Sequence, residues 1–464
     1  MDVSLLTGWL PWTLRIAALA ALAAAIGRRD ARWYRRELPI ALAAALGPTL
    51  LGALGVSWFG DLDDPLPFGL WGWTWCALLA VGVLLTGWRG ARWWTRAAAP
   101  AAMVLAVVCA ANSLNIATGY YPDLGDAAAD LSGKPVPQQM SLAEARKAVG
   151  RAETGRVVAV DIPAQPSGFS HRKEFVYLPP AWFRSKQRPK LPVVEMIGGV
   201  FAEPENWIRA GNAVEIADAY AAAHNGNAPI LVFADATGDF KTDTECMNGK
   251  AGKAEDHLLK DIPKYVSKTF GTATGPKKWA VAGWSMGGTC ALTITLAHPD
   301  VFGRFLDISG DPAPSKGDRK QTLEELFDGD EQAMAAHDPT SLLAASRRDT
   351  FKGVSGWFAV GEDETKRVAQ LKKLEPAAKA TGIATRVSVI PGKHNWQVAA
   401  TAFEEALPWL AQELGTPGAK PAKQPAKPAG SPSPSPTAPS GSPTAPPGAP
   451  SAASAAPAAS PDRK

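Results

Sequence analysis

The pattern of hydrophobic and polar residues divides the chain into an apolar N-terminal part and a longer, mixed part. Four apolar runs cover residues 5–26, 38–59, 68–87 and 97–116. Each run is long enough to cross the roughly 30 Å of hydrocarbon in a bilayer. Four such runs in series would leave little chain to cover them in a soluble core, so residues 1–119 are predicted to form four transmembrane helices.

The charges between these runs predict how the helices are oriented. Five arginines follow the first run and three follow the third, whereas the loop between the second and third runs has three aspartates and no basic residue. Because basic loops stay in the cytoplasm, the N-terminus and everything after about Tyr120 are expected outside the plasma membrane. The first run lacks a basic leader and more spans follow it, which argues against a cleaved signal peptide.

The mixed part begins with a linker over residues 120–153, which contains one short helix capped by Ser141. From residue 154 to residue 414, strand-like apolar segments alternate with helical ones. Strands are expected at residues 157–162, 174–178, 191–197, 230–234, 279–282, 305–309, 356–360 and 385–390. Helices are expected at residues 212–224, 254–270, 289–298 and 396–414. This alternation predicts an α/β domain with a mostly parallel sheet.

Two further segments differ from this alternation. Residues 311–350 form an insertion rich in charge and in helix formers, and two interpretations stay open: a cap over the active site, or a solvated helical excursion. Residues 415–464 consist of Pro, Ala, Ser, Gly, Thr and Lys for the most part, without apolar periodicity. Such a segment buries too little surface to offset the entropy of ordering, so a disordered tail is expected.

Charge and residue spacing argue against nucleic acid and metal ions as partners. The net charge is only +4 and the basic residues are spread along the chain, so nucleic acid is not an expected partner. No group of His, Cys or Asp residues has the spacing of metal ligands. We therefore expect neither a metal nor any other cofactor.

A Gly-x-Ser-x-Gly pattern occupies residues 283–287, between a predicted strand and a predicted helix. In a nucleophile elbow this pattern forms a sharp turn that exposes the serine hydroxyl above the sheet. Glycines are needed on both sides because a Cβ atom there would clash with the strand and the helix. Ser285 is therefore the candidate nucleophile, and the alternative is an ordinary glycine-rich turn.

A nucleophilic serine needs a base, and three histidines follow Ser285 in the chain. His394 comes after the last predicted strand, where the base of this arrangement belongs, since the chain order is serine, acid, histidine. His337 in the insertion is the alternative base. His298 is too close to the serine in sequence to fold back over it.

The base in turn needs an acid that orients it, and the loop after strand 356–360 offers three carboxylates. Glu364 stands at the usual offset, three residues after Gly361, and Asp363 is adjacent to it. The residues alone therefore leave both open as the acid. Glu362 is a third candidate, and Asp307, after another strand, is a weaker one.

Two backbone amides are expected to form the oxyanion hole. One belongs to Met286, directly after the nucleophile, and the other to Val200, in the glycine-containing loop after strand 191–197. The alternative is that this loop is a plain turn.

A disulfide can persist outside the membrane, and pairing Cys246 with Cys290 would tie a loop to the nucleophile helix. Two unpaired buried thiols are the alternative.

Several segments of residues 155–414 resemble the putative esterase (esterase D-like) family, and within it the mycolyltransferases of mycobacteria and corynebacteria. The resemblance lies in residues 169–177, 255–263 and 282–292, and in the Gly-x-His-x-Trp motif of residues 392–396. It implies an α/β-hydrolase fold, a Ser–acid–His triad and acyl transfer or ester hydrolysis through an acyl-enzyme. Because mycolyltransferases use glutamate as the acid, it favours Glu364 over Asp363.

One stretch departs from the mycolyltransferase pattern. Those enzymes carry Asp-Gly-Leu-Arg where this chain has residues 198–201, so that Gly198 replaces the aspartate and Phe201 replaces the arginine that helps to hold the sugar acceptor. Transfer of mycolate to trehalose is therefore not the expected reaction.

These observations together predict a membrane-anchored, extracytoplasmic serine esterase or acyltransferase, acting on a lipid or glycolipid ester in the cell envelope. A non-catalytic envelope protein that binds glycan or lipid on the same fold is the first alternative, and the intact set of serine, histidine and acid argues against it. A transporter or channel is the second. The four runs contain no paired ionisable relay, which favours an anchor.

Overall fold

The computed structural model describes residues 3–27, 29–59, 65–88, 92–150 and 152–419. The predicted tail falls almost wholly on residues 420–464, and the aspartates of the predicted acidic loop fall on residues 60–64. Both predictions therefore lie outside the described residues.

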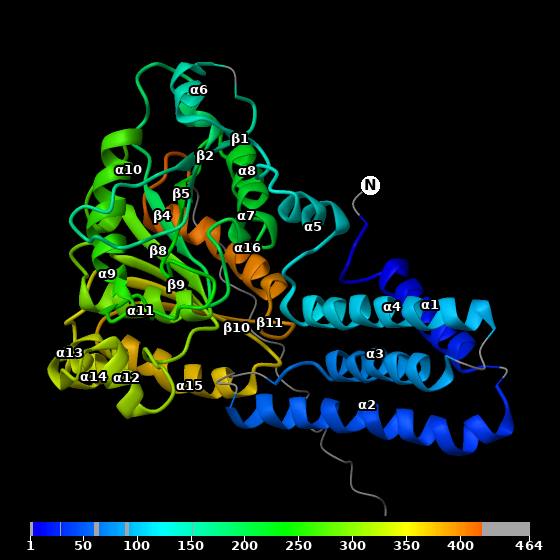
Figure 1. The fold of residues 1–464 in the computed structure, drawn as a ribbon. Helices are drawn as coiled ribbons and strands as arrows, with labels where there is room; N and C mark the ends of the chain where they lie inside the picture. Colours follow the sequence, from blue (N-terminus) through cyan, green and yellow to red (C-terminus); the bar gives the residue numbers. More distant parts are fainter. Residues whose placement is uncertain (1–2, 28, 60–64, 89–91, 151, 420–464) are drawn as a thin grey trace, which may run out of the picture. The chain divides into compact units, whose positions relative to one another are not determined.

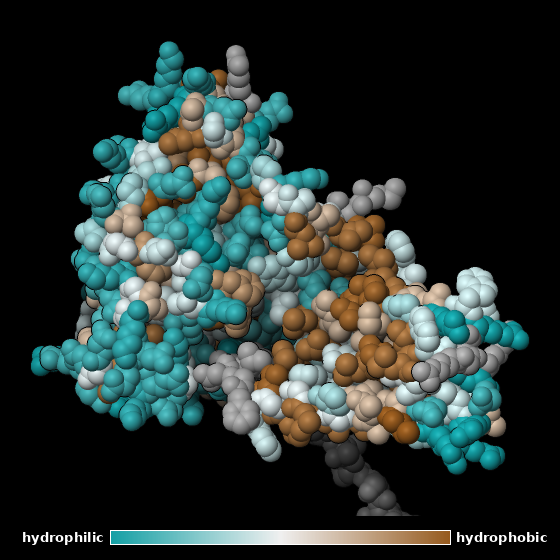
Figure 2. Space-filling model, in the orientation of Figure 1, coloured by the Kyte–Doolittle hydropathy of each residue, from teal (hydrophilic) through white to brown (hydrophobic). Residues whose placement is uncertain are grey.

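Four long apolar helices make up the N-terminal region, as the hydrophobic runs predict (Figure 1). They are α1 (Trp9–Ile26), α2 (Ala31–Phe59), α3 (Phe68–Gly87) and α4 (Trp93–Thr118). Among the described residues these four are long and apolar enough to cross a membrane. Small residues line the contacts between them; a Cβ atom on Gly82, for example, would lie 3.0 Å from that of Ala41. Small side chains let apolar helices approach closely, and large apolar side chains point outward instead (Figure 2).

The predicted linker is more structured than the sequence suggests. It contains α5 (Leu124–Leu131), β1 (Gln139–Met140) and α6 (Leu142–Lys147). Ser141 and Glu144 form a capping box at the start of α6, where the sequence predicts the short helix. Strand β1 pairs in parallel with β2, so the sheet of the following domain begins inside the linker.

The sheet of this domain has nine strands among the described residues, in the order β1-β2-β3-β5-β4-β8-β9-β10-β11. After β1, these strands are β2 (Arg156–Val160), β3 (Glu174–Leu178), β4 (Val193–Ile197), β5 (Ile230–Ala234), β8 (Trp279–Trp284), β9 (Arg304–Ile308), β10 (Ser355–Gly361) and β11 (Ala384–Ile390). Only β3 runs antiparallel to its neighbours. This is the mostly parallel sheet of an α/β-hydrolase, which confirms the predicted fold class.

Helices cover both faces of the sheet (Figure 1). On one face lie α7 (Asn206–Arg209), α8 (Ala213–Ala223) and α16 (Trp396–Glu413), which share a core with Trp207, Trp357 and Phe403. On the other lie α10 (Ile262–Phe270), α11 (Met286–Ala297) and α15 (Thr365–Ala380), around Val281, Phe305 and Phe358. The helix predicted at 254–270 forms in three parts, because α9 (Ala254–Asp256) and the π-helical turn η2 (His257–Asp261) precede α10.

The insertion between β9 and β10 is helical. It holds α12 (Arg319–Leu326), α13 (Glu331–His337) and α14 (Pro339–Ala345). Helices α13 and α14 pack on α11, and Leu326, Phe327 and Leu343 join the core of that face. The insertion is thus packed against the helix that follows the candidate nucleophile. This packing disagrees with the interpretation of the insertion as a solvated excursion.

Candidate active site

The candidate nucleophile lies on a strained turn between β8 and α11. Ser285 has φ 60° and ψ −125°, a conformation that non-glycine residues rarely adopt. The two glycines of the motif allow this turn: a Cβ atom on Gly283 would lie 1.9 Å from the carbonyl oxygen of Gly287, and one on Gly287 would lie 2.2 Å from that of Ile197. The elbow therefore holds its serine in place through backbone contacts that leave no room for side chains.

His394 stands over this serine and links it to Glu364. Its Nε2 lies 2.9 Å from the Oγ of Ser285, and its Nδ1 lies 2.7 Å from Oε2 of Glu364. With the proton on Nδ1 donated to the carboxylate, Nε2 can accept the proton of the serine hydroxyl. The ring of Trp284 stacks on that of His394, with centroids 5.0 Å apart. Of the candidate residues, the structure thus brings together Ser285, His394 and Glu364.

The carboxylate of Glu364 is buried and fully engaged. Its Oε1 accepts hydrogen bonds from Ser309 Oγ at 2.6 Å and from the backbone N–H of Gly361 at 2.8 Å. Burial alone would raise the pKa of Glu364, but the hydrogen bonds from His394, Ser309 and Gly361 outweigh it and lower the pKa below its usual value. The acid is therefore ionised, as an orienting partner of histidine must be. Ser309 was not singled out by sequence reasoning.

The other candidate acids lie elsewhere. The side chains of Glu362 and Asp363 are exposed on the same turn, and among the hydrogen bonds and ion pairs of the described residues, His394 is joined to Glu364 and not to these two. Asp307 is buried at the end of β9 and accepts a hydrogen bond from the N–H of Gly310. Burial raises the pKa of Asp307 to about 7, so this group is a poor anionic partner for a histidine.

The other candidate bases are equally remote from the serine. His298 caps the C-terminal end of α11 and His337 ends α13. Both rings contact the carboxylate of Glu255, not Ser285.

The loop predicted to supply an oxyanion donor lies beside the nucleophile. A Cβ atom on Gly199 would stand 3.0 Å from that of Ser285, which places the loop after β4 against the elbow. Met286 is the first residue of α11, where backbone N–H groups have no partner within the helix. Among the described residues, the N–H groups of Met286 and Val200 donate no hydrogen bond within the protein. Neither group is therefore engaged within the described part of the chain, as the prediction of an oxyanion hole requires.

Arg172 is hydrogen-bonded to the loop after β4, a contact that sequence reasoning missed. Its Nη2 donates to the carbonyl oxygen of Ala202 at 2.9 Å, to Asp235 Oδ1 at 2.7 Å and to Thr237 Oγ1 at 2.6 Å. Asp235 is buried, and hydrogen bonds from Arg172 lower its pKa against the effect of burial. The fork of one guanidinium thus connects the loops that follow β4 and β5. The position of Arg172 before β3 gives no sequence signal for this role.

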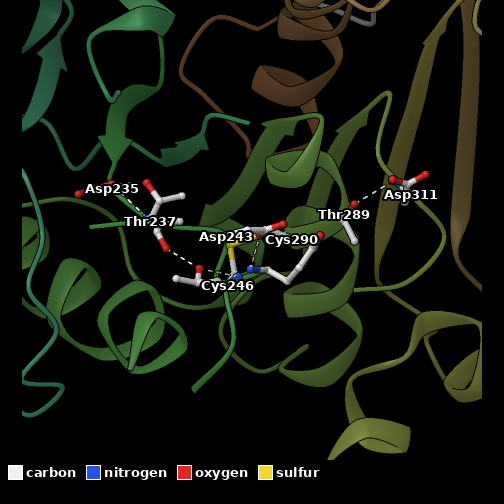
Figure 3. The surroundings of a disulfide bond; sticks show 10 residues. Asp235, Thr237, Asp243, Cys246, Thr289, Cys290 and Asp311 are labelled. Carbon is white, nitrogen blue, oxygen red and sulfur yellow. Dashed lines mark hydrogen bonds between the residues drawn. A yellow bond between two sulfur atoms is a disulfide. The ribbon is translucent and has the colours of Figure 1, made fainter. Parts of the chain in front are cut away.

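Cys246 and Cys290 form a disulfide, with Cα atoms 5.7 Å apart (Figure 3). The bond joins the loop after β5 to α11, five residues beyond the nucleophile. Thr289, next to Cys290, accepts a hydrogen bond from the N–H of Asp311 at 2.9 Å. The nucleophile helix is therefore fastened to segments on both sides.

Two aromatic rings are exposed, one of them on the loop after β4 that lies beside Ser285. Phe201 and Phe240 are each almost half exposed, and their ring centroids lie 5.6 Å apart. Phe201 adopts φ 64°, an unfavourable conformation for a bulky residue. Among the described residues after β2 begins, the other large exposed apolar side chains are Val387 and Val389 on the edge strand β11. The aromatic pair is thus an unusual feature of the domain surface, two residues from Gly199.

Comparison with known proteins identifies the family. The model of a family described as putative esterase matches residues 170–410, which is more than half of the chain. The chain belongs to this family. The expected resemblance is thereby confirmed, and the chain is a serine hydrolase of the esterase or acyltransferase kind.

Individual relatives share parts of the sequence or the fold. An uncharacterized protein of Corynebacterium glutamicum is 32% identical over 326 residues, which cover 67% of this chain and 75% of the relative. The MPT51 antigen of Mycobacterium leprae is 30% identical over 136 residues, 27% of this chain and 42% of the antigen. Among solved structures, a ferulic acid esterase is similar with a TM-score of 0.47 and 19% identity, over 56% of this chain and 99% of that enzyme.

Proposed function

We propose that the protein is a membrane-anchored, extracytoplasmic enzyme that cleaves or transfers ester-linked acyl groups through an acyl-serine intermediate. The observation that carries this proposal is the unbroken chain of contacts from Ser285 through His394 to Glu364. A protein that only binds a ligand has no need of a strained serine aligned with a histidine and an ionised acid.

The proposed reaction assigns one task to each group. The Oγ of Ser285 attacks the ester carbonyl carbon while Nε2 of His394 takes its proton. Glu364 keeps the imidazole in the required tautomer and stabilises the imidazolium. The N–H groups of Met286 and Val200 stabilise the oxyanion. His394 then gives the proton to the leaving alcohol, and water or a second alcohol releases the acyl group by the reverse steps.

The surface near the serine favours an apolar substrate over a sugar held by charge. Phe201 stands where the resembling mycolyltransferases carry an arginine, and it forms an exposed pair with Phe240. Covering these rings with an acyl chain would remove apolar surface from water, which is favourable by roughly 25 cal/mol per Å². We infer a lipid or glycolipid ester of the cell envelope as the substrate, and the aromatic pair as a contact for its acyl chain.

The proposed location is supported by the four apolar helices and by the charges of their connecting loops. With basic loops in the cytoplasm, an even number of spans leaves the esterase domain outside. The disulfide between Cys246 and Cys290 agrees with this placement, since such bonds persist in oxidising compartments.

The direct test of the function is covalent labelling of the nucleophile. Full-length protein in detergent is treated with a fluorophosphonate probe, alongside the Ser285→Ala variant and a Ser185→Ala variant as a matched control, since Ser185 is an exposed serine outside the site. Labelling of wild type and Ser185→Ala, but not of Ser285→Ala, is the expected result. Equal labelling of wild type and Ser285→Ala would show that the proposed nucleophile is wrong. Mass spectrometry of envelope lipids after incubation with the enzyme then identifies the acyl group.

A further inference from the structure

A carboxylate and two imidazoles converge at the far end of the nucleophile helix. Glu255 lies in α9, His298 follows α11 and His337 ends α13 of the insertion. Oε1 of Glu255 lies 2.7 Å from Nε2 of His298 and 2.8 Å from Nε2 of His337. The carboxylate is buried, whereas both rings are partly open to solvent. Three segments that are distant in sequence thus direct their ligand atoms at one point.

The hydrogen bond at the other ring nitrogen of His337 shows that a positive charge is needed between His337 and Glu255. Its Nδ1 lies 2.8 Å from the carbonyl oxygen of Ala333, which can only accept, so Nδ1 must carry a proton. Nε2 of the neutral ring then presents its lone pair to Oε1 of Glu255, which is also an acceptor. A positive charge has to lie between them, either a second proton on His337 or a metal ion. A backbone carbonyl on the remote nitrogen is one of the common ways in which a metal-binding histidine is oriented.

The carboxylate is suited to a cation. Glu255 is buried, its Oε1 faces both imidazoles, and a carboxylate oxygen is a ligand that zinc takes together with histidine nitrogens.

A second cluster of the same residue types, around His171 and His257, lacks this property. Both ring nitrogens of His171 lie at backbone carbonyl oxygens, 2.8 Å from that of Arg172 and 2.7 Å from that of Ile162, so both are engaged by the backbone. Neither nitrogen is left to bind a metal. The ring of His171 also stacks on that of His257, so the two rings face each other and not a common ion.

We propose that Glu255, His298 and His337 bind a zinc ion that fastens the helical insertion to the nucleophile helix. Two histidines and one carboxylate at about 2.0–2.2 Å, with water as the fourth ligand, form a common zinc site. Ligand atoms around a tetrahedral zinc ion lie about 3.3 Å from one another, so the distances of 2.7 and 2.8 Å from Glu255 to the two histidines need to open by about half an ångström. Sequence reasoning found no metal motif because His298 and His337 follow Glu255 by 43 and 82 residues.

This zinc ion would be structural. His298 and Ser285 lie at opposite ends of α11, a helix of 12 residues, and so about 18 Å apart at 1.5 Å per residue. The ion cannot touch the reacting atoms from there. It would instead hold α13 against the C-terminal end of the helix whose N-terminal end carries the nucleophile.

The test measures zinc binding by the full-length protein in detergent, with no substrate present. Chelator-treated wild type, His337→Ala and a control His224→Ala variant are titrated with Zn²⁺ by calorimetry, and their thermal unfolding is followed. We expect one zinc ion per chain in wild type and in His224→Ala, and a Tm higher by about 5 °C at a hundredfold excess over Kd. Both effects are expected to vanish in His337→Ala. Ca²⁺, which prefers oxygen ligands, is expected to have no effect.

A further variant separates loss of the metal from loss of the fold. Glu255→Gln keeps the size and polarity of the side chain but removes the charge, so it is expected to fold and to bind zinc at least a hundredfold more weakly. Zinc binding of equal strength in wild type and in both variants, or no binding by wild type at micromolar Zn²⁺, would overturn the proposal and leave an ion pair of protonated His337 with Glu255. Because these readouts involve no ester, they are independent of whether Ser285 is a nucleophile.

Discussion

Replacing the acid of the triad by its amide is the sharpest test of the proposed mechanism. In Glu364→Gln the side chain keeps its size, but only one of its two terminal atoms can accept hydrogen bonds. The backbone N–H of Gly361 lies 2.8 Å from Oε1 and can only donate, so the amide oxygen has to occupy the Oε1 position. The amide NH₂ then faces Nδ1 of His394. It occupies the position of Oε2, which accepts the hydrogen bond from Nδ1 in the wild type.

This orientation reverses the tautomer of the histidine. Facing an NH₂ group, Nδ1 of His394 must accept a hydrogen bond, so the proton moves to Nε2. Nε2 can then no longer take the proton of Ser285, 2.9 Å away. The same change in a serine–histidine–aspartate triad lowers kcat about 10⁴-fold, which corresponds to about 5.4 kcal/mol of lost transition-state stabilisation. We expect a fall of about 10³–10⁴-fold here.

The assay is hydrolysis of a short p-nitrophenyl ester by full-length protein in detergent, with kcat and KM determined separately. The matched control is Asp363→Asn, since Asp363 is the adjacent, exposed carboxylate that the sequence leaves as an alternative. It is expected to retain kcat within about twofold. Thermal unfolding of both variants establishes that they are folded.

Two outcomes would refute this reasoning. If Glu364→Gln keeps a tenth or more of the wild-type kcat, the contact between Glu364 and His394 does not set the tautomer. If Asp363→Asn loses as much activity as Glu364→Gln, the turn after β10 presents a different carboxylate to the histidine during catalysis.

Three further predictions concern residues that support the site. Replacing both Cys246 and Cys290 by alanine removes a cross-link between residues 44 apart, and loop entropy gives a loss of about 4 kcal/mol in the free energy of unfolding; an unchanged urea midpoint would contradict this. The pKa of buried Asp307 is raised to about 7, so between about pH 4 and pH 7 the unfolded chain releases a proton that the folded domain retains, and stability falls as the pH rises. Asp307→Asn should therefore raise Tm relative to wild type at pH 8 but not at pH 4, and a pH-independent difference would argue against this account. Arg172→Lys removes the fork that holds the loop after β4, and we expect kcat for ester hydrolysis to fall about tenfold to a hundredfold in a still folded protein; an unchanged kcat would exclude this positioning role.

The regular elements were predictable where local pattern and burial agree. Strands β3 and β5 begin and end where the apolar runs predict, because a central strand buried on both faces consists of apolar residues almost throughout. Helix α15 was not predicted from the sequence. Half of its residues are polar or charged, and Pro376 lies inside it, so its pattern is weak. The parallel pairing of β10 and β11 nevertheless requires a crossover between them, and topology supplies the helix that the local pattern does not indicate.

The choice between Glu364 and Asp363 was beyond the reach of local sequence for a different reason. Both carboxylates follow β10, and nothing in their identity says which one faces inward. Tertiary hydrogen bonds decide: the N–H of Glu362 donates to Ile390 at 2.7 Å and that of Asp363 to Gly392 at 3.0 Å. These bonds fix the turn against the end of β11, so that Asp363 is exposed and Glu364 is buried beside the histidine.

The arrangement of the proposed triad follows from the order of the strands. The sheet runs β4-β8-β9-β10-β11 at this side, and the carboxyl ends of parallel strands share one edge, where ligands bind. Strand β11 is three strands from β8, about 14 Å away at 4.8 Å per strand. The loop that carries His394 therefore has to reach back over the ends of β10 and β9 to meet the serine after β8. Glu364, after β10, stands along this path and Ser309, after β9, fixes its carboxylate, so the acid belongs between the two in space as it does in the chain.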